Sequence, residues 1–158
     1  MTNTIKSNDL VCYHLNQCNE QLEKQLQSQI ITIRSPIYRG LDDVVRTEIE
    51  STVEKTQSKN KMLPKLTVIL ETTGGSIEVV ERISNVFRKH FHEVDYIVPG
   101  YAYSAGTVLA LSGDNIYMDY YSVLGPIDPQ IEQDGKFVPG RDIFTCMKIL
   151  LKKAKIIL

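Results

Sequence analysis

Two short segments carry residues whose types and spacing could support covalent catalysis, and each follows an apolar run. The first contains Gly74 and Gly75, which come after the apolar residues 66–70 and directly before Ser76. Adjacent glycines let the backbone turn sharply, so that its N–H groups can face outward and bind an anion or an oxyanion. The segment has neither G-x-G-x-x-G nor a following Gly-Lys-Ser/Thr, which excludes a phosphate loop. A double glycine after a strand is also ordinary turn chemistry.

Ser104 is the candidate nucleophile of the second segment, GYAYSAGT at residues 100–107. It precedes an expected helix of small residues, so its hydroxyl would lie at the positive end of the helix dipole. Ala102 and Gly106, two residues to either side, are small enough for the tight strand-to-helix turn that presents a nucleophile. Ser104 could instead only cap that helix. The glycine pair one βα unit earlier favours the catalytic interpretation, because both segments would lie at the same edge of the sheet.

The spacing of apolar residues predicts the elements that must position these segments. Apolar residues at steps of three and four predict an amphipathic helix over about residues 9–28. Its narrow apolar stripe could pack either on the core of this chain or on a neighbouring subunit. Strands are expected at 30–34, 66–70, 94–98 and 115–118. Helices are expected at 41–53, 104–111 and 144–155, and a further helix is expected to begin after Ser76, which would cap it. Because strands and helices alternate, we expect an α/β fold with a mostly parallel sheet, flanking helices and functional loops at the carboxyl ends of the strands.

The composition predicts one domain over residues 1–158, since 42% of the 158 residues are hydrophobic and 23% are charged. The 18 Lys and Arg are balanced by 19 Asp and Glu, which argues against nucleic acid as a partner. No apolar run reaches the roughly 18–20 residues that span a bilayer, and the first residues have no apolar signal region. We therefore predict a cytoplasmic protein without a membrane span.

The three cysteines predict reduced thiols rather than a disulfide framework. Cys12, Cys18 and Cys146 are an odd number, at spacings that match no paired zinc motif. Cys12, His14 and Cys18 would make an incomplete tetrahedral shell. We expect no metal and no cofactor.

The stretch from residue 66 to residue 130 resembles the Clp-fold serine proteinases of the ClpP/crotonase superfamily. The resemblance is closest to the serine dehydrogenase proteinase group, relatives of signal peptide peptidase A. It rests on TGGS at 73–76, GYAYSAGT at 100–107 and LGPIDPQ at 124–130. It implies a ClpP/crotonase-like fold, an ATP-independent peptidase acting on peptide or protein substrates, and assembly into a homo-oligomer.

The resemblance also implies roles for four residues. By its motifs Ser104 is the nucleophile, Gly74 and Gly75 supply the oxyanion hole, and the N–H of Ala105 is a second oxyanion donor. Five tyrosines cluster around the presumed cleft, where they would hold an extended peptide or serve core and subunit contacts: Tyr101, Tyr103, Tyr117, Tyr120 and Tyr121.

The general base differs among relatives of this kind. Clp-type peptidases have a His in the loop where this chain has Asp128, whereas relatives of signal peptide peptidases use a Ser–Lys dyad. Burial lowers the pKa of such a Lys until its neutral amine accepts the Ser proton. We expect Lys148 to be the base, with Lys152 second, although their spacing equally fits a solvated helix face. Asp128 would orient the base or close its own turn.

Two other functions fit the same resemblance. One is a catalytically inactive member that binds peptide or a partner protein, which the missing His would allow. The other is crotonase-like acyl-thioester chemistry, which shares the oxyanion architecture, but no Glu pair lies near the loops to favour it. His14, His90 and His92 all precede Ser104, and the last two sit at the end of the helix after the glycine pair, far from the expected site.

Overall fold

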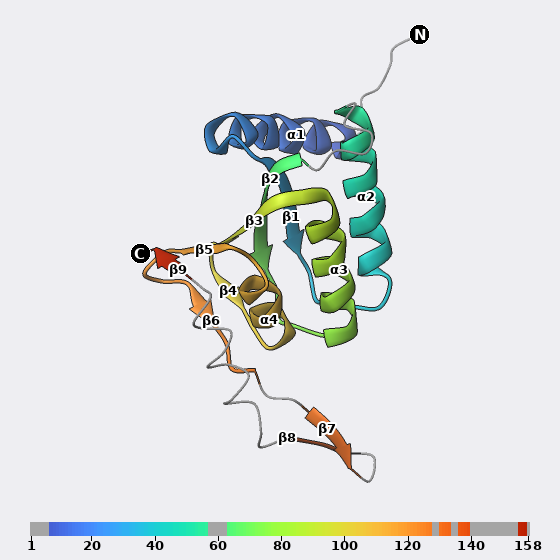
Figure 1. Cartoon of the computed structure of the whole chain (residues 1–158), viewed down its shortest axis with the longest axis vertical. Coiled ribbons are helices and arrows are strands. Elements are labelled where there is room, and N and C mark those ends of the chain that lie inside the picture. Colours follow the sequence, from blue (N-terminus) through green and yellow to red (C-terminus); the bar gives the residue numbers. More distant parts are fainter. Residues whose placement is uncertain (1–6, 57–62, 128–129, 134–135, 140–154, 158) are drawn as a thin grey trace.

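A five-stranded parallel sheet forms the centre of the fold (Figure 1). The computed structural model describes residues 7–56, 63–127, 130–133, 136–139 and 155–157. The strand order is β1-β2-β3-β5-β9, and every neighbouring pair is parallel. The strands are β1 (Gln29–Arg34), β2 (Leu63–Glu71), β3 (Phe91–Val98), β5 (Asn115–Met118) and β9 (Lys155–Ile157). The predicted α/β fold with a mostly parallel sheet is confirmed.

Three helices connect the first four strands of the sheet: α2 (Leu41–Lys55), α3 (Ile77–His90) and α4 (Ala105–Leu111). Right-handed crossovers between parallel strands that follow one another in the sheet place such helices on one face. Alternate residues of β2 and β3 are fully or almost fully buried in the core, together with α3 side chains such as Ile83 and Phe87. Ser76 caps α3 by accepting a hydrogen bond from the Val79 N–H at 3.4 Å, as its position in the sequence predicted.

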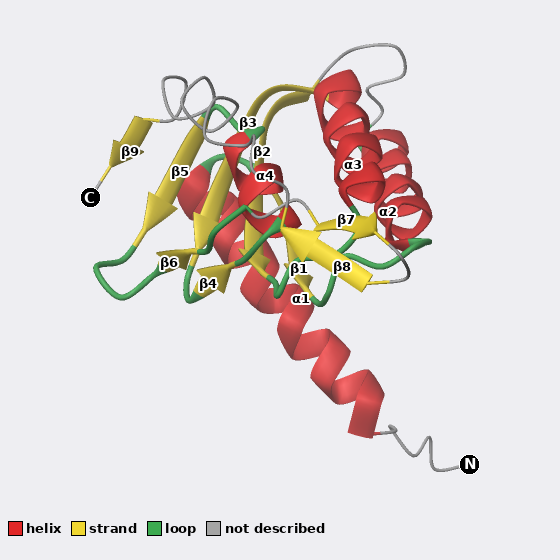
Figure 2. Ribbon diagram, turned by 90° about the horizontal axis from the view of Figure 1, so that it is seen from below, coloured by secondary structure: helices red, strands yellow, loops and turns green. Residues whose placement is uncertain are grey.

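The first helix, α1, runs over Ser7–Leu26 and not over residues 9–28. It ends earlier because Gln27 adopts a left-handed φ of 49°, and the Ser28 N–H donates to the Glu23 carbonyl. Much of its apolar stripe is exposed, with 57% of Val11 and 59% of Leu15 accessible. Figure 2 shows the N-terminal part of α1 extending away from the sheet.

Several short strands were not predicted from the sequence. β4 (Tyr101–Ala102) pairs in parallel with β6 (Val123–Leu124), and β7 (Gln130–Gln133) pairs antiparallel with β8 (Lys136–Pro139). The prediction of a helix over residues 144–155 is wrong at Lys155, because Lys155 begins strand β9. This strand extends the main sheet beside β5. The β-branched Ile156 and Ile157 suit that strand. Residues 144–154 lie outside the described part.

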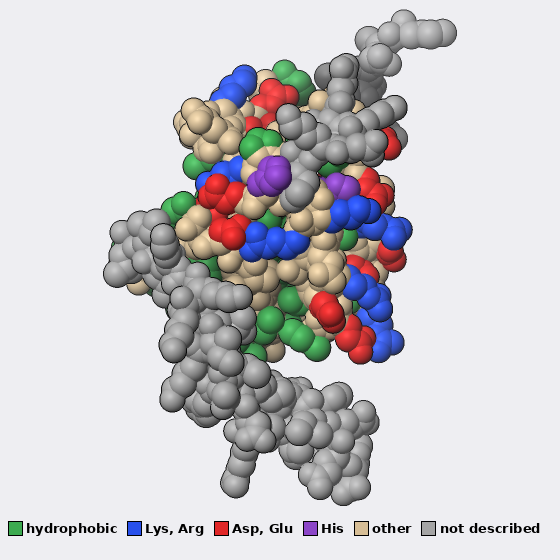
Figure 3. Space-filling view, in the orientation of Figure 1, with side chains coloured by type: hydrophobic (Ala, Val, Ile, Leu, Met, Phe, Trp, Pro, Cys, Tyr) green, Lys and Arg blue, Asp and Glu red, His purple; other side chains and the backbone are tan. Residues whose placement is uncertain are grey.

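Charged side chains of both signs are interspersed on the face drawn in Figure 3, with no large field of one sign over α2 and α3. Arg82 of α3 pairs with Asp42 of α2 at 3.1 Å, and Arg46 pairs with Asp43 within α2 at 3.5 Å. The first of these pairs links the two helices over the core.

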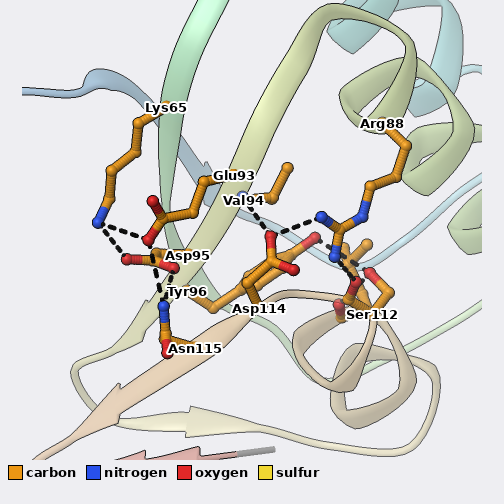
Figure 4. A network of polar contacts seen from close by, with 10 residues as sticks. Lys65, Arg88, Glu93, Val94, Asp95, Tyr96, Ser112, Asp114 and Asn115 are labelled. Carbon is orange, nitrogen blue, oxygen red and sulfur yellow. Dashed lines mark hydrogen bonds and ion pairs between the residues drawn. The ribbon is translucent and has the colours of Figure 1, made fainter. Parts of the chain in front are cut away.

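A polar network crosses β2, β3 and β5 (Figure 4). Lys65 Nζ lies 2.6 Å from Asp95 Oδ2 and 3.1 Å from Glu93 Oε1, and Asn115 donates to Asp95 Oδ1 at 2.7 Å. Asp95 is fully buried, and the ion pair with Lys65 is the contact that its Oδ2 makes among the described residues. Burial of Lys65 opposes its charge, but the carboxylates of Asp95 and Glu93 outweigh that effect and raise the pKa of its amine.

Replacing Lys65 with Met is expected to lower the free energy of unfolding by about 3–5 kcal/mol, because the Asp95 charge stays buried without its partner. The raised pKa means that Lys65 contributes its full stabilisation below the ordinary lysine pKa of about 10.4 and loses it as the pH rises through the folded value. Urea unfolding of the wild type and Lys65→Met measures the difference in the free energy of unfolding.

Arg34→Met is the control, since it removes an ion pair with Glu71 in which the Arg side chain is 77% exposed. It should cost at most about 1 kcal/mol, and equal losses in the two variants would contradict the prediction.

Candidate active site

The two segments singled out in the sequence are joined at Thr72, which directly follows β2. Its N–H donates to the Tyr101 carbonyl at 3.1 Å, and its carbonyl accepts from the Tyr103 N–H at 3.0 Å. These bonds form a parallel bridge between Thr72 and Ala102 of β4. On the other side of β4, the Gly125 N–H donates to the Ala102 carbonyl at 2.9 Å. Three chain segments therefore lie side by side at the carboxyl edge of the main sheet.

Gly74 lies directly against Ser104. A Cβ placed on Gly74 would be 2.8 Å from Ser104 Cβ and 2.6 Å from the Tyr103 carbonyl oxygen. Gly74 also has a φ of +95°, in the left-handed region that favours glycine. Both the conformation and the close approach exclude any side chain here. The diglycine loop and the candidate nucleophile thus meet at one place.

Ser104 adopts a strained backbone conformation, with φ 52° and ψ −121°. Among the described residues, only Gln27 also combines a side chain with a positive φ. Ser104 occupies the N-cap position of α4, yet its side chain makes no capping hydrogen bond and is half-buried. The alternative that Ser104 serves only as a helix cap is therefore not supported. Strain of this kind at a strand-to-helix turn is typical of exposed nucleophiles.

Gly106 allows α4 to begin close to the diglycine loop. A Cβ at this position would overlap the methyl group of Thr72. Thr107 then fixes the turn, because its buried hydroxyl lies 2.7 Å from the Ala102 carbonyl and 2.9 Å from the Gly125 carbonyl. No sequence pattern pointed to Thr72 or Thr107, since the contacts of a buried hydroxyl depend on distant segments.

The two glycine amides of the loop differ in their partners. The Gly74 N–H donates to Thr72 Oγ1 at 3.1 Å, and the Gly74 carbonyl accepts from the Ile37 N–H at 2.8 Å. The N–H groups of Gly75 and Ala105 donate to no residue that the structure describes. The Gly74 amide thus already has an acceptor in the free chain, whereas the amides of Gly75 and Ala105 have none among the described residues.

Comparison with known proteins places this fold and motif set in a family. The family model described as ClpP-like SDH-type serine proteinase matches residues 18–154, which is most of the chain. This chain belongs to the SDH-type serine proteinases. That result confirms the resemblance inferred from the motifs at residues 73–76, 100–107 and 124–130.

Two curated relatives of this SDH-type chain come from Methanocaldococcus jannaschii. Uncharacterized protein MJ0137 is 44% identical over 66 residues, covering 42% of this chain and 23% of the relative. Uncharacterized protein MJ1495 is 30% identical over 127 residues, covering 74% of this chain and 42% of the relative. The chain thus spans less than half the length of these relatives.

Two solved structures share the SDH-type fold, and both are described as 1510-N membrane-bound stomatin-specific protease. A serine-to-alanine mutant has a TM-score of 0.53 and 19% identity, over 76% of this chain and 57% of that one. A lysine-to-alanine mutant in complex with a substrate peptide has a TM-score of 0.54 and 22% identity, over 76% and 54% of the two chains. At these identities the likeness supports the fold alone.

The expected general bases of this SDH-type chain, Lys148 and Lys152, lie outside the described residues, as does Asp128. Within residues 7–56 and 63–127, no side chain forms a hydrogen bond with the Ser104 hydroxyl. His92 is the second residue of β3 and lies at the amino end of the sheet, opposite Ser104. His90 ends α3, and burial, followed by the charge of Lys89, lowers its pKa. Neither histidine is placed to act on Ser104.

The side-chain contacts of three of the five expected tyrosines are given by the structure. Tyr101 and Tyr103 stack beside Ser104, with ring centroids 4.9 Å apart, and Gly125 gives the Tyr103 ring its space. Tyr117 instead lines a cavity of about 410 Å³ that also includes Lys65 and Asp95. The stacked pair is therefore placed next to Ser104, whereas Tyr117 lines a separate cavity.

The described residues include no group of three or more His, Cys, Asp or Glu side chains that could bind a metal ion. None of their helices combines the length and the apolar character that crossing a membrane requires.

Proposed function

We propose that this chain is a serine peptidase in which Ser104 attacks a peptide carbonyl. The N–H groups of Gly75 and Ala105 would stabilise the oxyanion that forms, since a donor left unpaired in the free protein is ready for the charge that develops in the transition state. The contact between Gly74 and Ser104 carries this proposal, because it brings the diglycine loop to the nucleophile. Gly74 itself supplies space and not a donor.

The reaction is an acyl transfer in two steps. The Ser104 oxygen bonds to the carbonyl carbon as its proton passes to a base, and the leaving amine takes up a proton when the peptide bond breaks. Water then hydrolyses the acyl-enzyme and restores the Ser104 hydroxyl. The stacked pair of Tyr101 and Tyr103 would line the place where the substrate binds.

Lys148 is the proposed base, and Asp128 is the proposed orienting residue. The two 1510-N mutants with an altered serine and an altered lysine support this pair of residue types, since one of them is described with a substrate peptide bound. We further propose that the peptidase needs no ATP and forms a homo-oligomer, which the exposed apolar residues of α1 support. A cytoplasmic location stays a prediction from the sequence.

The test of the proposed function is to treat the folded wild-type chain with a fluorophosphonate probe and to map the adduct by mass spectrometry of its peptides. We expect one adduct, on Ser104, and cleavage of a mixed peptide library without ATP. No adduct, or an adduct elsewhere, would overturn the assignment. Peptide binding without cleavage or adduct would instead favour the inactive, peptide-binding member of the fold.

Replacing Lys148 with Met is expected to lower kcat by about 100-fold or more, because general base catalysis contributes about 10²–10⁴-fold to such reactions. Lys152→Met is the matched control and should keep kcat within about threefold of wild type, since in this proposal Lys148 and not Lys152 takes the Ser104 proton. Steady-state cleavage of a peptide found in the library measures both variants. The reverse ranking would assign the base to Lys152, and normal kcat in both would exclude a dyad with either lysine.

A further inference from the structure

We infer that Thr72 is a positioning residue for the oxyanion hole, whose hydroxyl holds the peptide plane before Gly74 while the Ile37 N–H holds the next plane, which carries the Gly75 N–H. This inference rests on the proposed peptidase function. Thr72 is only 2% exposed, and its Oγ1 lies 3.1 Å from the Gly74 nitrogen. A side-chain oxygen that accepts a hydrogen bond from the amide two residues ahead shapes the turn between them.

The two peptide planes on either side of Gly74 are held by different bonds. The Gly74 N–H belongs to the plane before it, which the Thr72 hydroxyl holds. The Gly74 carbonyl belongs to the plane after it, which the Ile37 N–H holds at 2.8 Å. In a planar trans peptide the C=O and the next N–H point in opposite directions. The Gly75 N–H therefore points away from Ile37 and has no described acceptor.

The remaining groups of Thr72 contact the other half of the site. Its backbone N–H and carbonyl bond to Tyr101 and Tyr103, just before Ser104. Its methyl group lies against Gly106, in the first turn of α4. One buried residue therefore contacts the diglycine loop through its hydroxyl and the nucleophile segment through its backbone and methyl group. These contacts can be separated, because Val keeps a methyl and loses the hydroxyl, whereas Ser does the opposite.

The test compares Thr72→Val, Thr72→Ser and Thr67→Val in the full chain. Thr67 is a matched control, since it is also 2% exposed and its hydroxyl donates to Ser28 Oγ at 2.8 Å, away from Ser104. We expect Thr72→Val to lower kcat by about 10- to 100-fold with KM within about twofold, because the oxyanion donors act mainly in the transition state. Thr72→Ser should retain kcat within about threefold. Thr67→Val should keep both constants within about twofold of wild type.

Amide hydrogen exchange provides a readout that does not depend on activity. In ¹⁵N-labelled protein the Gly74 amide should exchange about 10-fold faster or more in Thr72→Val than in wild type or Thr67→Val, because its acceptor is gone. Unchanged Gly74 exchange would overturn the inference, as would a kcat for Thr72→Ser as low as that of Thr72→Val. If the wild type neither cleaves peptides nor labels, the proposed function fails, and the exchange rates still decide whether Thr72 orients the loop.

Discussion

Replacing Ser104 with Ala is expected to abolish fluorophosphonate labelling and to lower kcat for peptide cleavage by about 10⁴-fold or more, as loss of a covalent nucleophile does in serine peptidases. Ser104 Oγ is the atom that would bond to the substrate carbonyl carbon, so its loss removes the reaction that forms the acyl-enzyme. The change should leave the fold intact. Alanine has a Cβ as serine does, so the φ of 52° at position 104 carries the same conformational strain in both proteins. No capping hydrogen bond is lost, because the Ser104 side chain makes none.

Ser112→Ala is the matched control for this prediction. Ser112 lies at the C-terminal end of α4, so the same substitution is made at the other end of the same helix. Its hydroxyl donates to the Leu109 carbonyl at 2.7 Å, and its loss should affect stability by about 1 kcal/mol without reducing the rate of labelling. Labelling that persists in Ser104→Ala would place the nucleophile elsewhere.

Replacing Gly74 with Ala is expected to lower kcat by about 10²–10³-fold, the range seen when an oxyanion donor is lost. The new methyl group would meet Ser104 Cβ at 2.8 Å and the Tyr103 carbonyl at 2.6 Å, so either the diglycine loop or the nucleophile segment must move. Movement of either would misplace the Gly75 N–H relative to the Ser104 hydroxyl. Steady-state kinetics and the rate of probe labelling measure the effect.

Gly40→Ala separates this close contact from the cost of the backbone conformation. Gly40 has a φ of +101°, similar to the +95° of Gly74, but a Cβ there would meet nothing within 4 Å. Both variants therefore take on a comparable left-handed strain, of about 1–2 kcal/mol. We expect only Gly74→Ala to lose activity, and equal losses in the two would show that general destabilisation is responsible.

The main elements of the fold could be predicted because their signals are local. The apolar run at 66–70 lies within β2, and Ser76 caps α3 as its position indicated. The end of α1 could not be predicted, since it depends on the left-handed turn at Gln27. The two-residue strands β4 and β6 could not be predicted because they are too short to carry a periodic pattern and form only by pairing with other segments.

The meeting of the two loops of the candidate site was predictable from the sequence, and their hydrogen bonds were not. The meeting of Gly74 with Ser104 follows from a general property of parallel sheets, since loops after neighbouring strands lie at one edge. Which glycine amide is free depends on the rotamer of Thr72 and on Ile37, a residue 37 positions before Gly74. Such contacts between distant segments leave no spacing pattern in the sequence.

The most direct test of the account is a crystal structure of the chain after reaction with a phosphonate that mimics a tetrahedral intermediate. We predict phosphorus bonded to Ser104 Oγ, with one phosphonyl oxygen at about 2.7–3.1 Å from both the Gly75 and the Ala105 nitrogens. A phosphonyl oxygen held by other groups or facing solvent, with those two amides unused, would contradict it.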